Sequence, residues 1–506
     1  MAGEHIEANR LNPAFQDSEL ILGLVAPVGT DFQRFQHSLE RCLKKFDYSF
    51  NLVRLSELAE HFDVDGSPAR TGSKEFIRLN ELMHAGNQLR LSSQKGEFLA
   101  LASAKAIRST RTDQEVRRRT AHILWSLKHP EEVRALRRIY GSGFYLIGIT
   151  VDEEQRRSHL RNNRGCTDEE ITKLLERDEH EEDPIYVGRD GENYGQRTRD
   201  TFHLADAFLP LDREDLLERF LKLLFGYPYE TPTNDEYAMY LAFASGLRSG
   251  DLSRQVGAVV VSSEGDIVAV GANDVPRAGG GLYWPGEDDD RDHVRGQDSN
   301  EHQRGVIVEA VLKVLCPSER SLDEWIQEGK LKLKGNPLMD ITEYGRATHA
   351  EMEALLSCGR AGLSPRGGTL YSTTFPCHNC AKHIVAAGIS RVVYVEPYPK
   401  SQALALFQDS IRVQNSTPYK RQGSPDPRVM FEAFEGVGPR RFFDLFSIGL
   451  SSGTTLKRKQ GGRTVDWVPG TAVVRVPLLP NSYLDRELAA TEELVGLTDK
   501  RTGPRT

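Results

Sequence analysis

Two short motifs restrict the fold of this chain more than any other feature of its sequence. Residues 348–351 read T-H-A-E, and residues 376–380 read P-C-H-N-C. His349 and Glu351 are two positions apart, so they can serve one site only at the very start of a helix, before its faces diverge. The interval between the motifs leaves room for a turn and one strand. We predict a helix over 348–358, a strand over 369–374 and a helix over 377–387.

The residue types in the two motifs suit a zinc ion. His349, Cys377 and Cys380 supply one imidazole and two thiolates, which fill three positions of a tetrahedral zinc and leave the fourth for water. Zinc lowers the pKa of that water towards neutrality. The cysteines open a helix, whose N-terminus favours the thiolate form. We predict one catalytic Zn²⁺ per subunit with these three ligands, and Glu351 as the residue that moves protons.

The order H-x-E and then P-C-x-x-C resembles the signature of the zinc-dependent nucleobase deaminases. In that chemistry water attacks C4 of cytosine, and the glutamate carries a proton to the ring nitrogen and to the leaving ammonia. Two other interpretations of the cysteine pair remain open, a redox pair and a closed structural zinc site. A closed site needs a fourth protein ligand, which Cys358 or His378 could offer, but it leaves Glu351 without a role.

Composition narrows the class of protein. The 506 residues fit two or three domains, and the hydrophobic and charged fractions are typical of a globular protein. A net charge of -8 argues against binding of long nucleic acid, although the net charge of a whole chain can hide a local basic patch. Residues 1–17 are polar and predicted to be a flexible N-terminus, and no apolar run is long enough for a membrane span. We expect a cytoplasmic protein whose six cysteines stay reduced.

The first domain is predicted over 18–227 as an α/β fold with a parallel sheet. Short apolar runs alternate with segments of helical spacing, which is typical of βαβ units. The charged stretch 168–182 is predicted to be an exposed, lid-like helix. Strands are predicted over 20–25, 49–55, 121–127, 144–151 and 202–209, and helices over 32–46 and 131–140.

The loop after the first strand resembles a degenerate phosphate-binding loop, and the whole domain is predicted to be like a P-loop kinase. With Ala26 at the first position of the Walker pattern, Asp31 and the two residues after it stand where Gly, Lys and Ser or Thr belong. The loop could still bind a nucleotide through backbone amides, or be purely structural. The candidate nucleotide-binding residues are Ala26, Pro27, Val28, Gly29, Thr30 and Asp31.

The second domain is predicted over 228–450 and holds the two motifs in a cytidine-deaminase-like three-layer αβα fold. A hairpin turn at 263–266 joins its first two strands, and the glycine-rich, acidic stretch 279–298 is predicted to be a loop. Residues 451–506 are predicted to be a C-terminal tail with a helix over 484–495. The remaining elements are predicted as helices over 235–247 and 401–407 and strands over 255–261, 267–273 and 391–396.

The hairpin, whose strands read S-R-Q-V-G-A-V-V and end in G-A-N-D, resembles the first hairpin of the deoxycytidylate deaminases. The resemblance implies that Asn273 hydrogen-bonds the sugar of a deoxycytidine nucleotide; by itself, a turn residue that closes a strand is the alternative. Arg254, Arg277 and Lys400 are candidates for phosphate contact, with surface ion pairs as the alternative. Phe375 and Tyr398 are candidates for the walls of the base pocket, with ordinary core packing as the alternative.

Four stretches, 126–141, 177–179, 394–401 and 436–442, carry a resemblance that extends over nearly the whole chain, about 20–445. With them, the chain resembles the bacterial antiphage dCTP deaminases, the family called DcdV or AvcD. The resemblance implies deamination of dCTP and dCMP, which drains the deoxycytidine pool during phage infection. It also implies inhibition by dTTP, silencing by a small RNA, and homo-oligomers such as hexamers. The loop without a lysine departs from the nucleotide-binding pattern.

Three alternatives remain at this stage. The same zinc chemistry could act on cytosine in single-stranded DNA or RNA, which would require a basic channel with stacking aromatic side chains. A deoxycytidylate deaminase could also supply dUMP without any role in defence. A third possibility is a non-catalytic scaffold that keeps a residual zinc site.

Overall fold

A computed structural model of the chain describes residues 17–62, 64, 71–111, 116–181, 183–315, 344–413, 426–449, 455–478 and 480–502. The predicted flexible N-terminus lies outside the described residues, apart from Asp17. The chain divides into two compact units, one formed by residues 1–232 with 435–506 and the other by residues 233–434. We call them unit 1 and unit 2 and describe each by itself.

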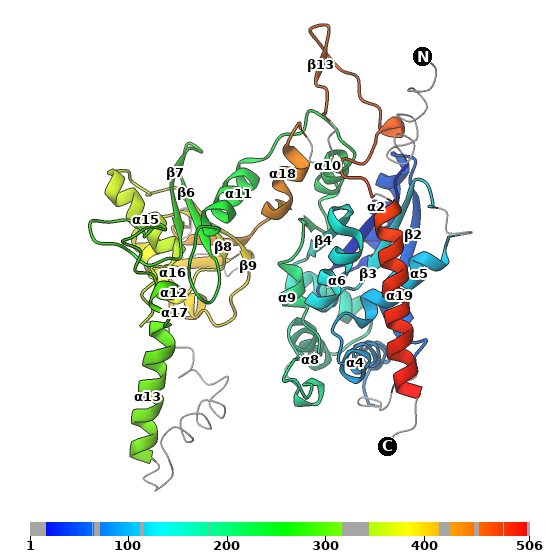
Figure 1. The fold of residues 1–506 in the computed structure, drawn as a ribbon, viewed down its shortest axis with the longest axis horizontal. Coiled ribbons are helices and arrows are strands. Elements are labelled where there is room, and N and C mark those ends of the chain that lie inside the picture. Colours follow the sequence, from blue (N-terminus) through cyan, green and yellow to red (C-terminus); the bar gives the residue numbers. More distant parts are fainter. Residues whose placement is uncertain are drawn as a thin grey trace. The chain divides into compact units, whose positions relative to one another are not determined.

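Unit 1 is built on a sheet in which the described residues form six strands, in the order β12-β5-β4-β1-β3-β2. Figure 1 labels β2, β3 and β4 of this sheet among the surrounding helices. Strands β1 to β5 are parallel, and β12 pairs antiparallel with β5. The parallel strands are therefore the alternating βαβ arrangement that the sequence predicts. The strands are β1 Leu20–Val25, β2 Ser49–Arg54, β3 Thr120–Trp125, β4 Phe144–Thr150, β5 Ala207–Pro210 and β12 Gly436–Val437.

Helices cover both faces of this sheet. Strand β1 is buried along its whole length, as expected of a central parallel strand. Its residues Leu20, Leu22 and Leu24 share one core with the apolar sides of α2 and α10, while α5, α6 and α19 pack on one another. The main helices are α2 Phe32–Lys44, α4 Lys74–Ser93, α5 Phe98–Ser109, α6 Pro130–Tyr140, α8 Asp168–Glu179, α10 Glu214–Leu224 and α19 Pro480–Thr502, and the shorter ones are α3 Leu55–Ala59, α7 Glu153–Ser158, α9 Thr198–Phe202 and α18 Phe442–Phe446.

Four of the five strands predicted for unit 1 lie within two residues of their observed bounds, and the fifth prediction is wrong in its first half. Phe202 ends helix α9, and the strand begins only at Ala207. Helices α4 and α5 were not predicted. Helix α8 is less exposed than its charge indicates, because Ile171, Leu174 and Asp178 are buried.

Unit 2 contains a second sheet, whose described strands lie in the order β10-β11-β9-β8-β6-β7. The predicted hairpin is confirmed as β6 and β7, which pair antiparallel, and β8 continues the antiparallel part. Strands β8, β9, β11 and β10 are parallel. The strands are β6 Gly257–Val261, β7 Ile267–Ala272, β8 Thr369–Thr374, β9 Arg391–Glu396, β10 Ile411–Val413 and β11 Val429–Ala433.

Two glycines let helices approach this sheet closely from opposite sides. A Cβ on Gly257 would lie 1.8 Å from the Ala242 carbonyl oxygen of α11, and one on Gly271 would lie 2.1 Å from the Ala350 carbonyl oxygen of α15. Helix α11 therefore covers one face and α15 the other, which gives the predicted three-layer αβα fold (Figure 1). The helices are α11 Asn234–Gly246, α12 Asp292–Arg295, α13 Ser299–Leu315, α15 Ala350–Ala361, α16 His378–Ala386 and α17 Ala403–Leu406.

The division of the chain differs from the predicted domains 18–227, 228–450 and 451–506. Residues 435–506 return to unit 1, because Gly436 and Val437 add a strand beside β5 and helix α19 packs against α5. A buried ionic cluster joins Arg111 to Glu19 and to Glu487 of α19, with all three side chains at most 1% exposed. None of the helices among the described residues is both long and apolar enough to cross a bilayer.

Candidate active site

The two sequence motifs lie at the starts of two neighbouring helices of unit 2. His349 is the residue before α15, and Cys377 is the residue before α16. Cys380 lies in the first turn of α16, and its backbone N–H points to the Cys377 sulfur at 3.4 Å. Because α15 and α16 pack on the same face of the sheet, their first turns come together.

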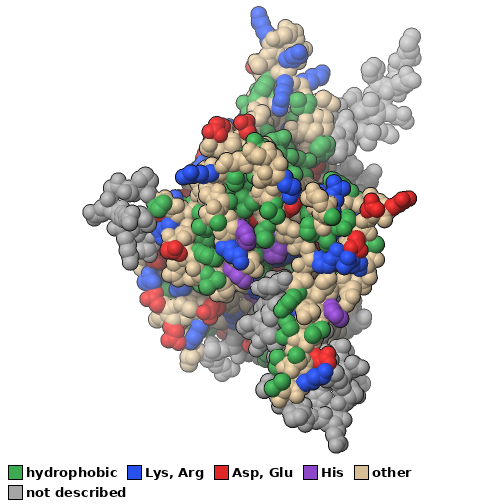
Figure 2. All heavy atoms as spheres, turned by 90° about the vertical axis from the view of Figure 1, so that its left-hand side faces the viewer, with side chains coloured by type: hydrophobic (Ala, Val, Ile, Leu, Met, Phe, Trp, Pro, Cys, Tyr) green, Lys and Arg blue, Asp and Glu red, His purple; other side chains and the backbone are tan. Residues whose placement is uncertain are grey.

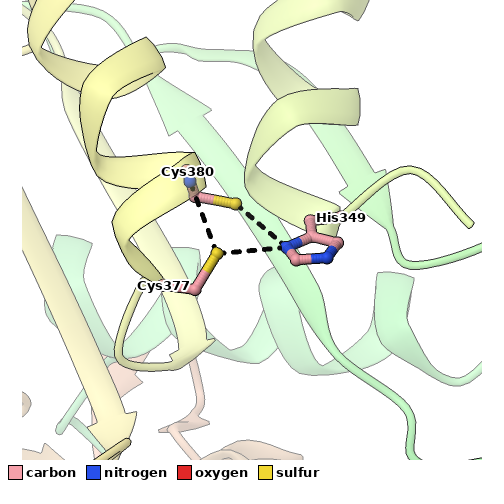
Figure 3. Close-up of side chains that lie close together, drawn as sticks. All are labelled: His349, Cys377 and Cys380. Atoms are coloured by element: carbon pink, nitrogen blue, oxygen red, sulfur yellow. Dashed lines mark hydrogen bonds between the residues drawn. The ribbon is translucent and has the colours of Figure 1, made fainter. Parts of the chain in front are cut away.

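The side chains of His349, Cys377 and Cys380 converge on one point (Figure 3). His349 Nδ1 lies 3.3 Å from the Sγ atom of each cysteine. All three ligand atoms lie within 4.8 Å of one another. An imidazole and two thiolates at this spacing fit a zinc ion that keeps one position open.

The described residues do not supply the fourth ligand that a closed structural site needs. Within the described part of the chain, the group that could hold a metal contains three residues and no fourth protein ligand. Neither Cys358 nor His378 belongs to it. An open position is the arrangement expected of a catalytic rather than a structural zinc.

The charges of the three side chains favour metal binding. The hydrogen bond from the Cys380 thiol lowers the pKa of Cys377 to about 3; burial opposes this, and the His349 imidazole adds to it. The hydrogen bond to Cys377 in turn raises the pKa of His349 to about 9. One thiolate is therefore already formed at neutral pH, and binding of zinc displaces the protons that the other ligands carry.

Glu351 lies beside the ligands, in the first turn of α15. Its side chain is 4% exposed, and burial raises the pKa of its carboxyl. The Ser372 hydroxyl donates to this carboxylate at 3.4 Å, and the Cys380 sulfur lies 3.4 Å from its other oxygen. The fully buried Ser372 of β8 was missed by sequence reasoning, since a serine inside a strand carries no signal of its own.

Asn273, the residue after β7, forms hydrogen bonds with the backbone of the segment that contains Arg254. Its Oδ1 accepts from Val256 N at 2.6 Å, and its Nδ2 donates to the Arg254 carbonyl at 2.8 Å. The Arg254 guanidinium lies 3.2 Å from Glu396 and 5.2 Å from the ring centroid of Tyr398. The structure thus brings Asn273, Arg254 and Tyr398 together.

The other predicted substrate contacts are more scattered. Phe375 is buried, and its ring packs on Tyr394 and Phe431 in the core of unit 2. Arg277 is exposed and its guanidinium donates to the Gly280 carbonyl within its own turn. Lys400 is exposed, two residues after Tyr398.

The predicted nucleotide-binding loop, Ala26–Asp31, belongs to unit 1, whereas the metal-ligand group belongs to unit 2. It connects β1 to α2, and Asp31 caps that helix by accepting from Arg34 N. A lysine that the loop itself lacks reaches it from elsewhere, since Lys128 Nζ donates to the Ala26 carbonyl at 2.7 Å. Sequence reasoning missed Lys128 because it follows a different strand, β3.

Comparisons with known proteins agree with the zinc site. Residues 232–396 match the cytidine and deoxycytidylate deaminase zinc-binding region. The chain is 31% identical over 191 residues to a probable deoxycytidylate deaminase of Drosophila melanogaster, and this match covers 37% of the chain and 71% of the fly protein. It is 30% identical over 160 residues to the deoxycytidylate deaminase of Homo sapiens, covering 32% of the chain and 63% of the human protein.

Among solved structures, the chain is similar to the dCMP deaminase of cyanophage S-TIM5 in complex with dCMP and dUMP. The two are 19% identical with a TM-score of 0.23, and the match covers 41% of the chain and all of the phage protein.

Proposed function

The chain belongs to the cytidine and deoxycytidylate deaminase family, and from this premise we propose that it hydrolyses the exocyclic amine of deoxycytidine nucleotides. The observation that carries this proposal is the placement of buried Glu351 beside the converging ligand atoms of His349, Cys377 and Cys380. Those three residues would hold the zinc cofactor, which lowers the pKa of water in the open position when it is bound.

Glu351 handles the protons of this reaction. Its carboxylate accepts a proton from the attacking water and delivers it to N3 of the cytosine ring. A second proton transfer converts the C4 amine into a leaving ammonia, so that a C4–O bond replaces the C4–N bond. Burial raises the pKa of Glu351 towards the pH at which it must both accept and donate, and the Ser372 hydroxyl fixes its orientation.

The substrate contacts extend this proposal. Asn273 binds the sugar, because each polar atom of its amide keeps one further hydrogen-bonding position beyond the contacts to Arg254 and Val256. Arg254, Arg277 and Lys400 contact the phosphates, and Phe375 and Tyr398 flank the base. Arg254 and Tyr398 lie together beside Asn273. This placement supports the proposed roles of Arg254 at the phosphates and Tyr398 at the base more directly than those of the other three residues.

We further propose that dCTP is a substrate as well as dCMP, and that the reaction depletes the deoxycytidine pool during phage infection. The support is the whole-chain resemblance to the antiphage dCTP deaminases. Inhibition by dTTP, silencing by a small RNA and assembly into homo-oligomers such as hexamers belong to the same proposal.

The direct test is incubation of purified, zinc-loaded protein with dCTP, dCMP, CTP and cytosine while ammonia release is followed. We expect turnover of both deoxynucleotides. If zinc-containing protein turns over neither dCTP nor dCMP, the proposal is wrong. A cytosine-containing oligonucleotide serves as a further substrate. Basic and acidic side chains are interspersed over the face in Figure 2, so we expect free nucleotides to be preferred.

A role in defence is tested in cells. Cells that express the protein and cells that express Glu351→Ala are infected with phage, and their nucleotides are profiled. We expect loss of dCTP and protection only with the native glutamate. Protection that survives Glu351→Ala would favour the scaffold alternative instead.

A further inference from the structure

Asp274, the residue after Asn273, is a buried carboxylate to which the proposed reaction assigns no role. Its side chain is 1% exposed. Its Oδ1 accepts from Val275 N at 2.9 Å, and its Oδ2 accepts from Gly250 N at 3.3 Å. Arg291 Nη1 lies 3.3 Å from the same Oδ2, and its charge offsets the cost of burying the carboxylate. Both carboxylate oxygens are therefore used to hold neighbouring segments in place.

The backbone of Asp274 is paired with the segment that leads to the metal ligand His349. Thr348 N donates to the Asp274 carbonyl at 3.0 Å, and the two residues form an antiparallel bridge. His349 follows Thr348 directly and precedes α15. The Ser249 hydroxyl donates to the carbonyl of Asn273 at 2.6 Å, which fixes the residue on the other side. Asp274 thus joins the segment of a metal ligand to the residue proposed to bind the sugar.

A second arginine holds the same ligand-bearing segment. Arg346 Nη1 donates to Asp292 Oδ1 at 2.8 Å and to the Asp290 carbonyl at 2.9 Å. Asp290 and Asp292 flank Arg291 in the chain. One short stretch therefore holds the segment before α15 twice, directly through Arg346 and indirectly through Asp274. We call Asp274, Asp290, Arg291, Asp292 and Arg346 the ionic clamp.

The start of α15 depends on this support. The residue before a helix often caps the free N–H groups of the first turn with its own side chain. The side chain of His349 instead faces Cys377 and Cys380 (Figure 3). Because a displacement of about 1 Å at a catalytic site can cost about a hundredfold in rate, the contacts that hold the residues before α15 matter for the site.

We propose that Arg291 and Arg346 are positioning residues for the deaminase reaction. The ionic clamp holds His349 at the separation from Asn273 that one deoxycytidine nucleotide spans, so that the base lies at the ligand group while the Asn273 amide binds the sugar. Asn273 and Asp274 are consecutive, so a loosened clamp shifts the sugar contact and the metal ligand relative to each other. This inference rests on the proposed function, but its effect on metal binding is measured without turnover.

The test compares zinc affinity and turnover in variants of the full chain. Arg346→Gln changes a side chain that is 24% exposed, so the fold should survive. Its zinc affinity, measured by competition with a chromogenic chelator, should fall by about tenfold. At saturating zinc, kcat/KM for dCMP should fall by about tenfold or more. Arg291→Gln should show the same two losses, and Arg346→Lys, which retains the charge but not the planar fork, should recover part of them.

Arg391→Gln is the matched control. Arg391 is 32% exposed and pairs with Asp235 and Glu432. It begins β9, whereas Cys377 follows the opposite end of the neighbouring parallel strand β8. Loss of this ion pair should lower the melting temperature and leave both zinc affinity and kcat/KM unchanged.

The outcomes decide the proposal even if Arg291→Gln does not fold, because Arg346→Gln then decides it alone. The proposal is overturned if folded Arg346→Gln retains the zinc affinity and the kcat/KM of the native chain. It is also overturned if Arg391→Gln lowers zinc affinity as much as Arg346→Gln does. A native protein that binds zinc but turns over no deoxycytidine nucleotide would contradict the proposed function, and the zinc affinities would still test the clamp.

Discussion

His349 Nδ1 and Cys377 Sγ lie 3.3 Å apart, although a helix and a strand separate the two residues in the chain. Each stands directly before a helix, His349 before α15 and Cys377 before α16. The metal site therefore depends on the packing of two helix starts on one sheet face. Its ligands do not come from a single local motif.

Removing one ligand should empty this site. In Cys380→Ser, a hard hydroxyl replaces a thiolate that zinc prefers, and we expect zinc affinity and deaminase activity to fall by more than about a hundredfold. Zinc content is measured by elemental analysis beside ammonia release. Cys358→Ser changes a cysteine outside the ligand group and should leave the zinc content unchanged. Equal zinc content in Cys380→Ser and the native chain would contradict the assignment.

Replacing the proton-transfer group should separate metal binding from turnover. Glu351→Gln keeps the size of the side chain and leaves the three ligands in place, so zinc should be retained while kcat falls by about 100-fold to 10,000-fold. The measurement is kcat for dCMP and dCTP at equal zinc occupancy. A variant that loses zinc and activity together would indicate that Glu351 holds the ligands instead.

Glu353→Gln is the matched control for that substitution. Glu353 lies two residues later on α15, is also buried, and pairs with Arg360 instead of the metal ligands. Its loss should lower the melting temperature and leave kcat nearly unchanged. If kcat falls comparably in Glu351→Gln and Glu353→Gln, turnover depends on any buried carboxylate of α15 and not on the position of Glu351.

The sequence predicts the zinc ligands well because each of the two motifs that supply them is local. The cysteine spacing fixes two ligands within one helical turn, and His349 and Glu351 share another, so no distant contact is needed to find them. Most strands of both sheets follow from short runs such as Leu20–Val25, which is buried along its whole length, whereas the short strands β10, β11 and β12 were not predicted. Patterns of this kind depend only on neighbouring residues.

Features that depend on distant contacts could not be predicted. The return of residues 435–506 to unit 1 rests on an ionic cluster that joins Glu487 to Arg111 and Glu19, and such a cluster has no periodicity in the sequence. The approach of Lys128 to the Ala26 loop depends in the same way on strand order. Helix α4 escapes detection because buried polar residues such as Asn80 and Asn87 interrupt its apolar face.

A methyl group at Gly257 should disrupt unit 2. The Cβ of Gly257→Ala would lie 1.8 Å from Ala242 O and 2.5 Å from Gly246 N, so α11 must move away from the sheet. We expect the free energy of unfolding to fall by about 2–4 kcal/mol. Gly286→Ala is the control, since a Cβ there meets no atom within 4 Å. Urea titrations followed by circular dichroism compare the two, and equal midpoints would contradict the close packing of α11.

Acid should destabilise unit 1 through Glu19. Burial opposes ionisation of this carboxyl, but hydrogen bonds from His122 and Arg111 outweigh it and lower the pKa to about 2 from its ordinary value of 4.5. Because the pKa is lower in the folded state, the stabilisation is complete above about pH 4.5 and is lost as the pH falls towards 2. The pKa difference corresponds to about 3 kcal/mol.

Melting temperatures at pH 7 and pH 3 test this prediction. The fall in melting temperature between the two pH values should be smaller in Glu19→Gln than in the native chain. Glu57→Gln, which changes an exposed carboxylate paired with Arg54, should retain the native drop, and an equal drop in all three proteins would refute the role of Glu19.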